Sequence, residues 1–429
     1  MALFIGIDLG TSGCRVIAID ENKQLIASAS HAIPPAIESG DGHFEQSAQL
    51  WWQALLAALE QLLQSINAEE VKAIAVDGTS ATLLLCDHRG LPLSSALMYN
   101  DTRCRNEASI IDQHAAHNSA AHGAGSSLAK LLNLSRQYPD AAHALHQADW
   151  IMGKLCGHFG HSDENNCLKL GFDPQLGKWP AWLEKLDINQ DLLPHVHTPG
   201  DAVAIIDKQL ALMTGLPEHT QIIAGTTDSI AAFIATGAHE LGEAVTSLGS
   251  TLVLKLISDK PVFSKQHGIY SHKLFGQWLL GGASNSGGAS LLRFFSLAEI
   301  QEMTPALKPQ HPTGFDYYPL PANGERFPIA DPAFKPRIPQ HMPDNSAERL
   351  LHFQGLLEGI SRIEKKGYQL LHELGAPWPS KVISVGGGAC NQAWRQIRQN
   401  DLQVPVVASA QQDAAYGSAL LALYGFARN

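Results

Sequence analysis

One pattern near the N-terminus constrains the fold most strongly: two apolar segments are separated by a short turn of glycine and small hydroxyl residues. The segments are residues 3–7 and 16–19, and the turn between them reads DLGTSG. Short apolar runs bounded by turn residues are typical of buried β-strands. Glycine lets the backbone approach a ligand with no Cβ in the way, and threonine or serine adds a hydroxyl donor. We therefore expect a strand–turn–strand unit whose turn lies against a ligand.

The same plan returns about half a chain later. Residues 244–258 read AVTSLGSTLVLKLIS, which is again strand, Gly-Ser turn and strand, so that SLGST is the counterpart of DLGTS. An internal repeat with this period predicts two similar lobes. Strand and helix patterns alternate around both units, so we expect α/β lobes with mixed sheets around a central cleft. The predicted lobes are residues 1–238 and 239–429.

Hydrophobic periodicity predicts the main elements of each lobe. We expect helices from Ser47 onward, through most of 105–160, over 347–374 and at the C-terminal end, and buried strands at 71–77, 81–87 and after Lys381. Residues 305–343 hold ten of the 23 prolines. Since proline interrupts helices and central strands, this stretch should be an ordered but irregular excursion.

Charge and cysteine usage limit the classes of function. The formal net charge of -11 argues against a general nucleic-acid or anionic-membrane binder, although backbone amides or a divalent metal can still bind phosphate. The six cysteines are scattered without a CxxC pair, which is typical of reduced thiols. The sequence shows no basic region followed by an apolar signal core, and no run of 18 apolar residues. We expect a soluble cytoplasmic protein.

Five short stretches share glycine and small polar residues and follow or abut apolar strands. They are DLGTSG (8–13), DGTSAT (77–82), GTTDS (225–229), SLGSTL (247–252) and GGGACN (386–391). One such stretch is compatible with an ordinary turn, but five at strand ends indicate a phosphate clamp. Neither a P-loop motif nor a dinucleotide-binding glycine motif after the first strand is present. Asp8 could hold a hydrated Mg²⁺ against phosphates, and Asp228 could accept the proton of an attacking hydroxyl.

Taken together, these stretches resemble the motifs of the FGGY family of carbohydrate kinases, within the actin-like, ribonuclease-H-like fold group. DLGTSGCR resembles the first phosphate motif, GTTDSIAA the catalytic-Asp motif, SLGSTL the second phosphate motif and GGGACN the adenosine motif. The segments HFEQS with WW, YNDTR and NGERFPIADP also resemble family segments. The resemblance covers nearly the whole chain. It implies phosphoryl transfer from ATP, with Mg²⁺, to a primary hydroxyl of a sugar or polyol.

The resemblance also implies roles for individual residues. Asp228 becomes the general base, and Asp8 the acid linked to the metal through water. The implied substrate-binding residues are Asp8, Ser12, Gly13, Cys14, Arg15 and Asp228. The implied nucleotide-binding residues are Gly10, Thr11, Gly249, Ser250, Thr251, Gly282, Gly386, Gly387, Gly388, Ala389 and Cys390.

The stretch after the strand at 71–77 indicates which sugar accepts the phosphate. Xylulose and glycerol kinases place a turn with Gln, Met or a similar residue there, whereas this chain has DGTSAT. With MYND, TTDSIAAFIA and YSHK, this stretch resembles the compact D-ribulose kinases (D-ribulokinases). We expect transfer to the 5-hydroxyl of D-ribulose; D-xylulose or another ketose or polyol is the alternative, and a non-catalytic sugar or nucleotide sensor a third reading. The expected partners are a ketose and ATP, with a homodimer left open.

Overall fold

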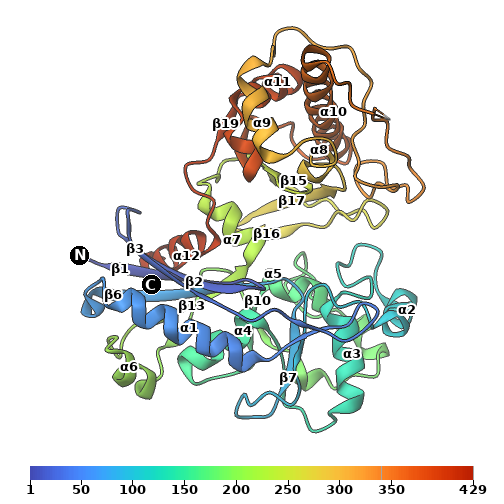
Figure 1. The fold of residues 1–429 in the computed structure, drawn as a ribbon. Coiled ribbons are helices and arrows are strands. Elements are labelled where there is room, and N and C mark those ends of the chain that lie inside the picture. Colours follow the sequence, from blue (N-terminus) through green and yellow to red (C-terminus); the bar gives the residue numbers. More distant parts are fainter. Residues whose placement is uncertain (340, 429) are drawn as a thin grey trace. The chain divides into compact units, whose positions relative to one another are not determined.

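The computed structural model describes residues 1–339 and 341–428, which form two compact units (Figure 1). Unit 1 comprises Met1–Gly237 together with the residues from Asp413 onward, and unit 2 comprises Ala238–Gln412. The expected lobes were residues 1–238 and 239–429. The structure differs from this division at the C-terminal end, where the last helix packs on the sheet of unit 1.

A six-stranded mixed sheet forms the centre of unit 1 within the described residues. Its strand order is β12 (Ala202–Ile205), β13 (Gln221–Thr227), β6 (Val71–Gly78), β1 (Leu3–Leu9), β2 (Gly13–Asp20) and β3 (Leu25–Ala32). The pairs β1–β2 and β2–β3 are antiparallel, whereas β1, β6 and β13 run parallel to one another. The predicted strand–turn–strand unit is therefore the β1–β2 hairpin.

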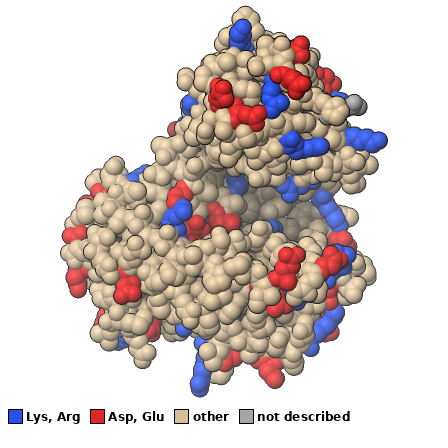
Figure 2. Space-filling model, in the orientation of Figure 1, with Lys and Arg blue, Asp and Glu red and all other residues tan. Residues whose placement is uncertain are grey.

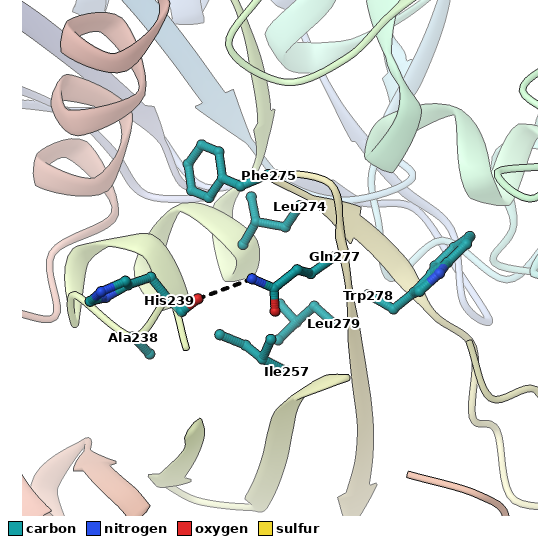
Figure 3. A pocket seen from close by; sticks show the side chains of 8 residues that line it. All are labelled: Ala238, His239, Ile257, Leu274, Phe275, Gln277, Trp278 and Leu279. Carbon is teal, nitrogen blue, oxygen red and sulfur yellow. Dashed lines mark hydrogen bonds between the residues drawn. The ribbon is translucent and has the colours of Figure 1, made fainter. Parts of the chain in front are cut away.

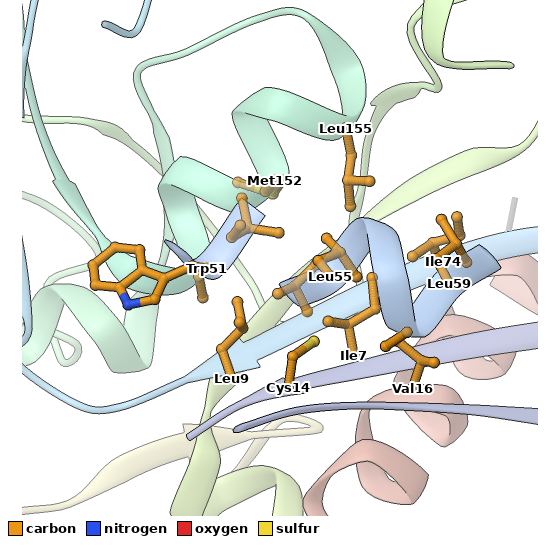
Figure 4. Packing of buried hydrophobic residues seen from close by; sticks show 14 of the residues in the cluster. Ile7, Leu9, Cys14, Val16, Trp51, Leu55, Leu59, Ile74, Met152 and Leu155 are labelled. Atoms are coloured by element: carbon orange, nitrogen blue, oxygen red, sulfur yellow. The ribbon is translucent and has the colours of Figure 1, made fainter. Parts of the chain in front are cut away.

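One face of this sheet is covered by α1 (Ala48–Leu63) and α4 (Gln147–Cys156). Figure 4 shows Leu55 and Leu59 of α1 near Ile7 and Val16 of the β1–β2 hairpin, with Leu155 of α4 in the same cluster. Full burial of one such side chain contributes about 1.5–3 kcal/mol to stability. This face is the main apolar core of unit 1.

The opposite face is covered by α12 (Ala414–Arg428), which approaches the backbone of β1 very closely. A Cβ built on Gly6 would lie 1.9 Å from the carbonyl oxygen of Ala415, and one on Gly417 would lie 1.8 Å from that of Ala231. Only glycine fits at these two contacts, because no side chain can occupy that space. These contacts explain why the C-terminal helix belongs to unit 1.

The remaining elements of unit 1 form a smaller sheet with surrounding helices. The sheet order is β4 (Ile37–Glu38), β5 (Phe44–Gln46), β8 (Ala96–Leu97), β7 (Leu83–Cys86) and β9 (His143–His146). A separate parallel pair consists of β10 (His161–Asp163) and β11 (His195–His197). The other helices are α2 (Arg105–His114), α3 (Ser127–Gln137), α5 (Glu164–Cys167), α6 (Lys208–Thr214) and α7 (Asp228–Ala235).

Unit 2 repeats the central topology of unit 1. Its sheet order is β16 (His272–Leu274), β17 (Gln277–Ser284), β15 (Leu252–Ser258), β14 (Glu243–Leu248), β18 (Lys381–Val385) and β19 (Val406–Ala408). The β14–β15 hairpin corresponds to β1–β2, and β18 lies parallel to β14 as β6 does to β1. The α/β lobes with mixed sheets that the repeat predicted are confirmed.

The helices of unit 2 are α8 (Gly288–Leu291), α9 (Leu297–Met303), α10 (Ser346–Glu373) and α11 (Gln392–Leu402). The proline-rich excursion before α10 is irregular, as predicted, and is anchored by the buried Glu325. This carboxylate accepts hydrogen bonds from the hydroxyls of Ser284 (2.6 Å) and Tyr318 (2.9 Å) and from the backbone N–H of Asn285 (2.9 Å). Glu325 therefore ties the excursion to the end of β17.

Surface charge and helix length give two further observations. Figure 2 shows acidic and basic side chains interspersed on the visible face rather than gathered by sign. No helix in the described part of the chain combines the length and apolar character that crossing a bilayer would require.

Candidate active site

Carboxylates gather at one edge of the unit 1 sheet, where the parallel strands β1, β6 and β13 end. Asp8 lies opposite Asp77 in the β1–β6 register, and Thr226 lies opposite Asp77 on the other side. Asp228 follows β13 directly and opens α7. Ligands of α/β proteins commonly bind at the carboxyl ends of parallel strands. The structure therefore brings Asp8 and Asp228, the two predicted catalytic residues, to the same edge.

Asp8 and Asp77 form a hydrogen-bonded carboxyl pair. Burial, followed by the charge of Asp8, raises the pKa of the fully buried Asp77 well above its ordinary value. Burial also raises the pKa of Asp8, to about 6, while the hydrogen bond from Asp77 opposes this rise. The hydroxyl of Ser418 on α12 donates to Asp77 at 2.6 Å. Burial therefore favours the protonated form of Asp77, which can donate a hydrogen bond to the carboxylate of Asp8.

Asp413, at the start of α12, is a member of this acidic group that sequence reasoning missed. Its carboxylate accepts a hydrogen bond from Arg15 at 2.6 Å, and its charge contributes to the raised pKa of Asp8. In the sequence, an aspartate before an apolar helical run is a typical helix cap, and Asp413 indeed accepts the N–H of Ala415. Nothing in that local pattern indicates that the helix returns to the first sheet.

The predicted substrate residue Cys14 lies in the apolar core of unit 1. Its side chain is buried in the core with Ile7, Leu9 and Val16, as Figure 4 shows. Burial, followed by the charges of Asp8 and Asp77, raises the pKa of its thiol. Successive side chains of a strand point to opposite faces, so Cys14 shares the face of Val16 while Arg15 faces α12. The burial of Cys14 indicates a core residue, and its contact with substrate stays a prediction.

The β1–β2 turn is held in place by the segment that contains Gln46. The N–H of Gly10 donates to the carbonyl of Gly13 at 3.0 Å, which closes the turn. The side-chain amide of Gln46 donates to the carbonyl of Thr11 at 3.2 Å, and the indole of Trp51 donates to Gln46 at 2.6 Å. The turn keeps Ser12 exposed, beside Gly13. Gly10, Thr11, Ser12 and Gly13 therefore stay together near Asp8, as expected of a phosphate or substrate turn.

The YNDTR segment is fixed by an ionic network rather than by a free charge. The buried Asp101 accepts hydrogen bonds from Arg103 and from the N–H of Phe44, each at 2.7 Å. Arg103 also pairs with Glu45 at 2.7 Å. This segment therefore joins two loops of unit 1.

Unit 2 contains a cavity of about 470 Å³ with an apolar wall. The wall consists of Leu291, Leu292, Leu297, Ile300, Leu357 and Trp394. Polar side chains in the lining are Gln301, Thr304, Asn391 and Ser250. A mostly apolar cavity of this size with a few polar groups suits a small ligand such as a nucleoside. We call it the unit 2 cavity.

Two glycine turns form the backbone side of the unit 2 cavity. The carbonyls of Gly249 and Ser250 in the β14–β15 turn accept hydrogen bonds from the N–H groups of Gly288 (2.8 Å) and Ala289 (3.1 Å). A Cβ on Gly386 would lie 2.9 Å from the backbone of Leu248, so the turn after β18 packs directly against β14. Because both turns contain glycine, this side of the cavity is lined largely by main-chain atoms.

The predicted nucleotide residues divide into three groups. Gly249, Ser250, Gly387, Gly388 and Cys390 line the unit 2 cavity, and Thr251, Gly386 and Ala389 lie in the same two turns. Gly10 and Thr11 belong to unit 1. Gly282 does not line the cavity: a Cβ there would lie 2.4 Å from the ring of Phe327, so Gly282 permits packing inside unit 2.

A second hollow of unit 2 is much smaller. Figure 3 shows Ile257, Leu274, Phe275 and Trp278 around it, with the amide of Gln277 donating to the carbonyl of His239 at 3.2 Å. Its volume is about 10 Å³, which corresponds to about one water molecule. This hollow cannot hold a sugar or a nucleotide.

The described residues contain no group of three or more His, Cys, Asp or Glu side chains that could hold a metal ion. Asp8 and Asp228 nevertheless present carboxylate oxygens, the ligand type that Mg²⁺ prefers. Mg²⁺ commonly uses one or two carboxylates together with substrate phosphates and water. The donor set at this edge therefore fits a water-linked Mg²⁺ that arrives with a nucleotide.

Comparisons with known proteins give a consistent result. The models of the FGGY family of carbohydrate kinases match this chain, the N-terminal domain over residues 3–235 and the C-terminal domain over residues 244–426. The xylulose kinase of Escherichia coli (strain K12) is 24% identical over 418 residues, covering 92% of this chain and 84% of the relative. That of Bacillus subtilis (strain 168) is 26% identical over 454 residues, covering 99% and 88%.

Solved structures share the fold. A xylulose kinase from Rhodospirillum rubrum superposes with a TM-score of 0.84 at 23% identity, covering 99% of this chain and 89% of that one. Glycerol kinase from Plasmodium falciparum, solved with ADP, gives a TM-score of 0.85 at 18% identity, with coverage of 98% and 89%. At these identities the likeness shows a common fold.

Proposed function

Because this chain belongs to the FGGY family of carbohydrate kinases, we propose that it transfers the γ-phosphate of ATP to the 5-hydroxyl of a ketopentose. One observation supports this most directly: Asp8 and Asp228 lie at the same edge of the unit 1 sheet, beside the β1–β2 turn. Phosphoryl transfer needs a group that receives the hydroxyl proton and groups that neutralise phosphate charge. This edge supplies a carboxylate that can receive the proton and some of the groups that would neutralise phosphate charge.

In the proposed mechanism, Asp228 accepts the proton of the attacking hydroxyl. Its carboxylate is half-buried at the first position of α7 and accepts the N–H of Ser229 at 2.6 Å, which fixes its orientation. A carboxylate can accept the proton of a substrate hydroxyl as a general base. Asp228 is the catalytic base of the proposal.

Asp8 carries the negative charge that the metal requires. Its carboxylate would hold Mg²⁺, and Asp77, whose hydrogen bond lowers the pKa of Asp8, would support its ionised form. When bound, Mg²⁺ neutralises charge on the transferring phosphate. In unit 1, the backbone of Gly10–Gly13 would bind phosphate oxygens. In unit 2, the cavity would hold the nucleoside beside the backbone of Gly249–Thr251.

For the acceptor sugar, the relatives favour the alternative over the first expectation. The curated relatives described above are named xylulose kinases, so D-xylulose is the leading candidate. D-ribulose, the substrate expected from the sequence, is the second. One observation supports it: residues 78–82 carry no Gln, Met or His, and their two threonines bond to each other at 2.6 Å.

A coupled ADP-release assay with Mg²⁺ and ATP tests the proposal against D-xylulose, D-ribulose, L-ribulose, ribitol and glycerol. We expect ATP consumption that depends on a ketopentose, and the preferred epimer identifies the substrate, since a site built for one hydroxyl configuration discriminates strongly. Equal ATP consumption without sugar would overturn the kinase proposal. If no acceptor is phosphorylated while sugar or nucleotide binding is retained, the result would favour a non-catalytic sensor.

A further inference from the structure

A buried lysine donates hydrogen bonds to the segment that follows β6. The proposed mechanism assigns no role to this lysine. Lys130 lies on α3, is fully buried, and donates hydrogen bonds of 2.7 Å to the carbonyls of both Ala81 and Met98. We name residues 78–82 the acceptor turn. We propose that Lys130 is a positioning residue that fixes the acceptor turn for ketose binding. This inference rests on the proposed function and names a determinant of its sugar site.

The acceptor turn begins between the two catalytic carboxylates. Gly78, the last residue of β6, pairs with Leu9 of β1 on one side and with Thr227 of β13 on the other. Leu9 directly follows Asp8, and Thr227 directly precedes Asp228. A hydroxyl that reaches Asp228 at the carboxyl ends of these strands therefore lies beside the acceptor turn.

The acceptor turn contains a backbone conformation that needs support. Ala81 has a φ of +68°, in the left-handed region that residues with a Cβ rarely adopt. Such conformations persist where surrounding contacts hold them, and they cluster at ligand sites. The carbonyl of Ala81 is one of the two that Lys130 binds. Lys130 thus supports the residue whose backbone conformation is strained, Ala81.

The threonine side chains of the turn are occupied within the protein. Thr79 donates its N–H (3.0 Å) and its hydroxyl (2.7 Å) to the amide oxygen of Gln147. Thr82 accepts the N–H of Tyr99 at 3.0 Å and lies 2.6 Å from the hydroxyl of Thr79. Since these hydroxyls are used internally, the turn can meet a sugar only with its backbone and with the half-buried Ser80. Backbone recognition depends on the turn holding one shape.

Burying a lysine costs free energy, because its amine loses its hydration. Burial lowers the pKa of Lys130 to about 7, so the neutral amine, with two N–H groups, is readily populated beside its two carbonyl acceptors. Methionine has similar length and would fill the same space without an amine to desolvate, although it would leave both carbonyls without their donor. These opposing effects predict a small net change in stability for Lys130→Met and a large change in the acceptor turn.

The test compares Lys130→Met and Lys130→Gln with Arg136→Met on the same helix, which removes an exposed cation that pairs with Glu107 at 3.2 Å instead of with the acceptor turn. For the ketopentose that the wild type prefers, we expect Lys130→Met to raise KM by about tenfold or more, because a displaced turn loses binding contacts. Lys130→Gln, which restores N–H donors on a side chain that is one atom shorter, should give an intermediate KM. The KM for ATP should stay within about twofold in all three variants, and Arg136→Met should match the wild type.

Calorimetric binding of the same ketose provides a second readout that is independent of turnover. An unchanged ketose KM and ketose Kd in folded Lys130→Met would overturn the inference. So would a loss of folding in both Lys130 variants, or an equal rise in the KM values for sugar and ATP, because each would indicate a general structural role. If the wild type itself phosphorylates no ketose, the proposed function fails and the inference with it, and that result is distinct because it appears before any substitution.

Discussion

At the scale of single residues, Asp8, Asp77 and Asp228 lie at the edge of the unit 1 sheet where we propose that the reaction takes place. We call it the active edge. The environments of Asp8 and Asp77 favour different protonation states. Burial raises the pKa of Asp77, which accepts a hydrogen bond from Ser418, well above its ordinary value, and raises that of the neighbouring Asp8 to about 6. Two adjacent buried carboxyls cannot both ionise at low cost, so their environments divide the roles. Asp228 lies at the same edge at the start of a helix, and its charge contributes to the raised pKa of both Asp8 and Asp77.

Asp228→Asn should lower kcat by roughly 10²–10⁴-fold, because a general base contributes about that factor and the amide cannot accept the proton. Nucleotide binding should persist, since the unit 2 cavity is built from other residues. Steady-state kinetics and ADP titration measure the two effects. A variant that retains more than a few per cent of activity would remove Asp228 from the role of base.

Lys130 gives a pH-dependent prediction for stability. Its pKa is about 7 in the folded protein and near 10.5 when exposed, so the unfolded chain binds more protons between these values. The free energy of unfolding contributed by Lys130 should therefore rise as pH increases from about 7 to about 10.5, relative to Lys130→Met. Urea unfolding of both proteins at several pH values measures this difference. A constant or falling difference across that range would show that Lys130 does not titrate as expected.

At the scale of elements, the C-terminal helix completes the first sheet instead of the second. α12 supplies Ser418 and follows Asp413, so it both covers β1 and shapes the charge at the active edge. Its contact with β1 passes through Gly6, where backbone meets backbone. The helix therefore links packing to the site.

Gly6→Ala should destabilise unit 1 strongly, because the new Cβ would lie within 2.2 Å of two backbone atoms of α12 that cannot move independently. Overpacking of this kind costs about 1–3 kcal/mol and sometimes more. Thermal unfolding should show a fall of several degrees, whereas Ala427→Ser on an exposed position of the same helix should change the midpoint by less than about 2 °C. Equal midpoints for the two variants would contradict the close contact.

Most elements of this fold were predictable from the sequence, and the exceptions have physical reasons. The β1–β2 and β14–β15 hairpins are visible as apolar runs around glycine turns, and the two phosphate turns follow from them. Cys14 was assigned to the substrate by its closeness to the turn, although strand alternation already placed it with Val16 in the core. The place of Asp413 could not be predicted, because it depends on which sheet a distant helix covers.

At the scale of the whole molecule, we propose that each of the two similar units holds one of the two ligands. The carboxylate edge belongs to unit 1, and the large apolar cavity with its glycine turns belongs to unit 2. Duplication of one topology explains why both units place a glycine turn at the same point of the sheet. Each ligand should therefore be separable by substitution in one unit.

Gly387→Val tests this separation. A Cβ at Gly387 would meet no atom within 4 Å, and the residue lines the unit 2 cavity, so the new side chain enters the cavity without a clash. We expect the Kd for ADP to rise by about tenfold or more, with the ketose Kd and the thermal midpoint close to wild type. A loss of ketose binding with ADP binding intact would contradict the assignment of ligands to units.

The most direct measurement of the central claim follows the transferred phosphate by ³¹P NMR. The protein is incubated with Mg²⁺, ATP and the preferred ketopentose, and with Asp228→Asn in parallel. We predict a phosphate monoester on the primary 5-hydroxyl that appears in step with ADP, and almost none from the variant. Release of inorganic phosphate without a sugar ester, or an undiminished rate from Asp228→Asn, would contradict phosphoryl transfer by this carboxylate edge.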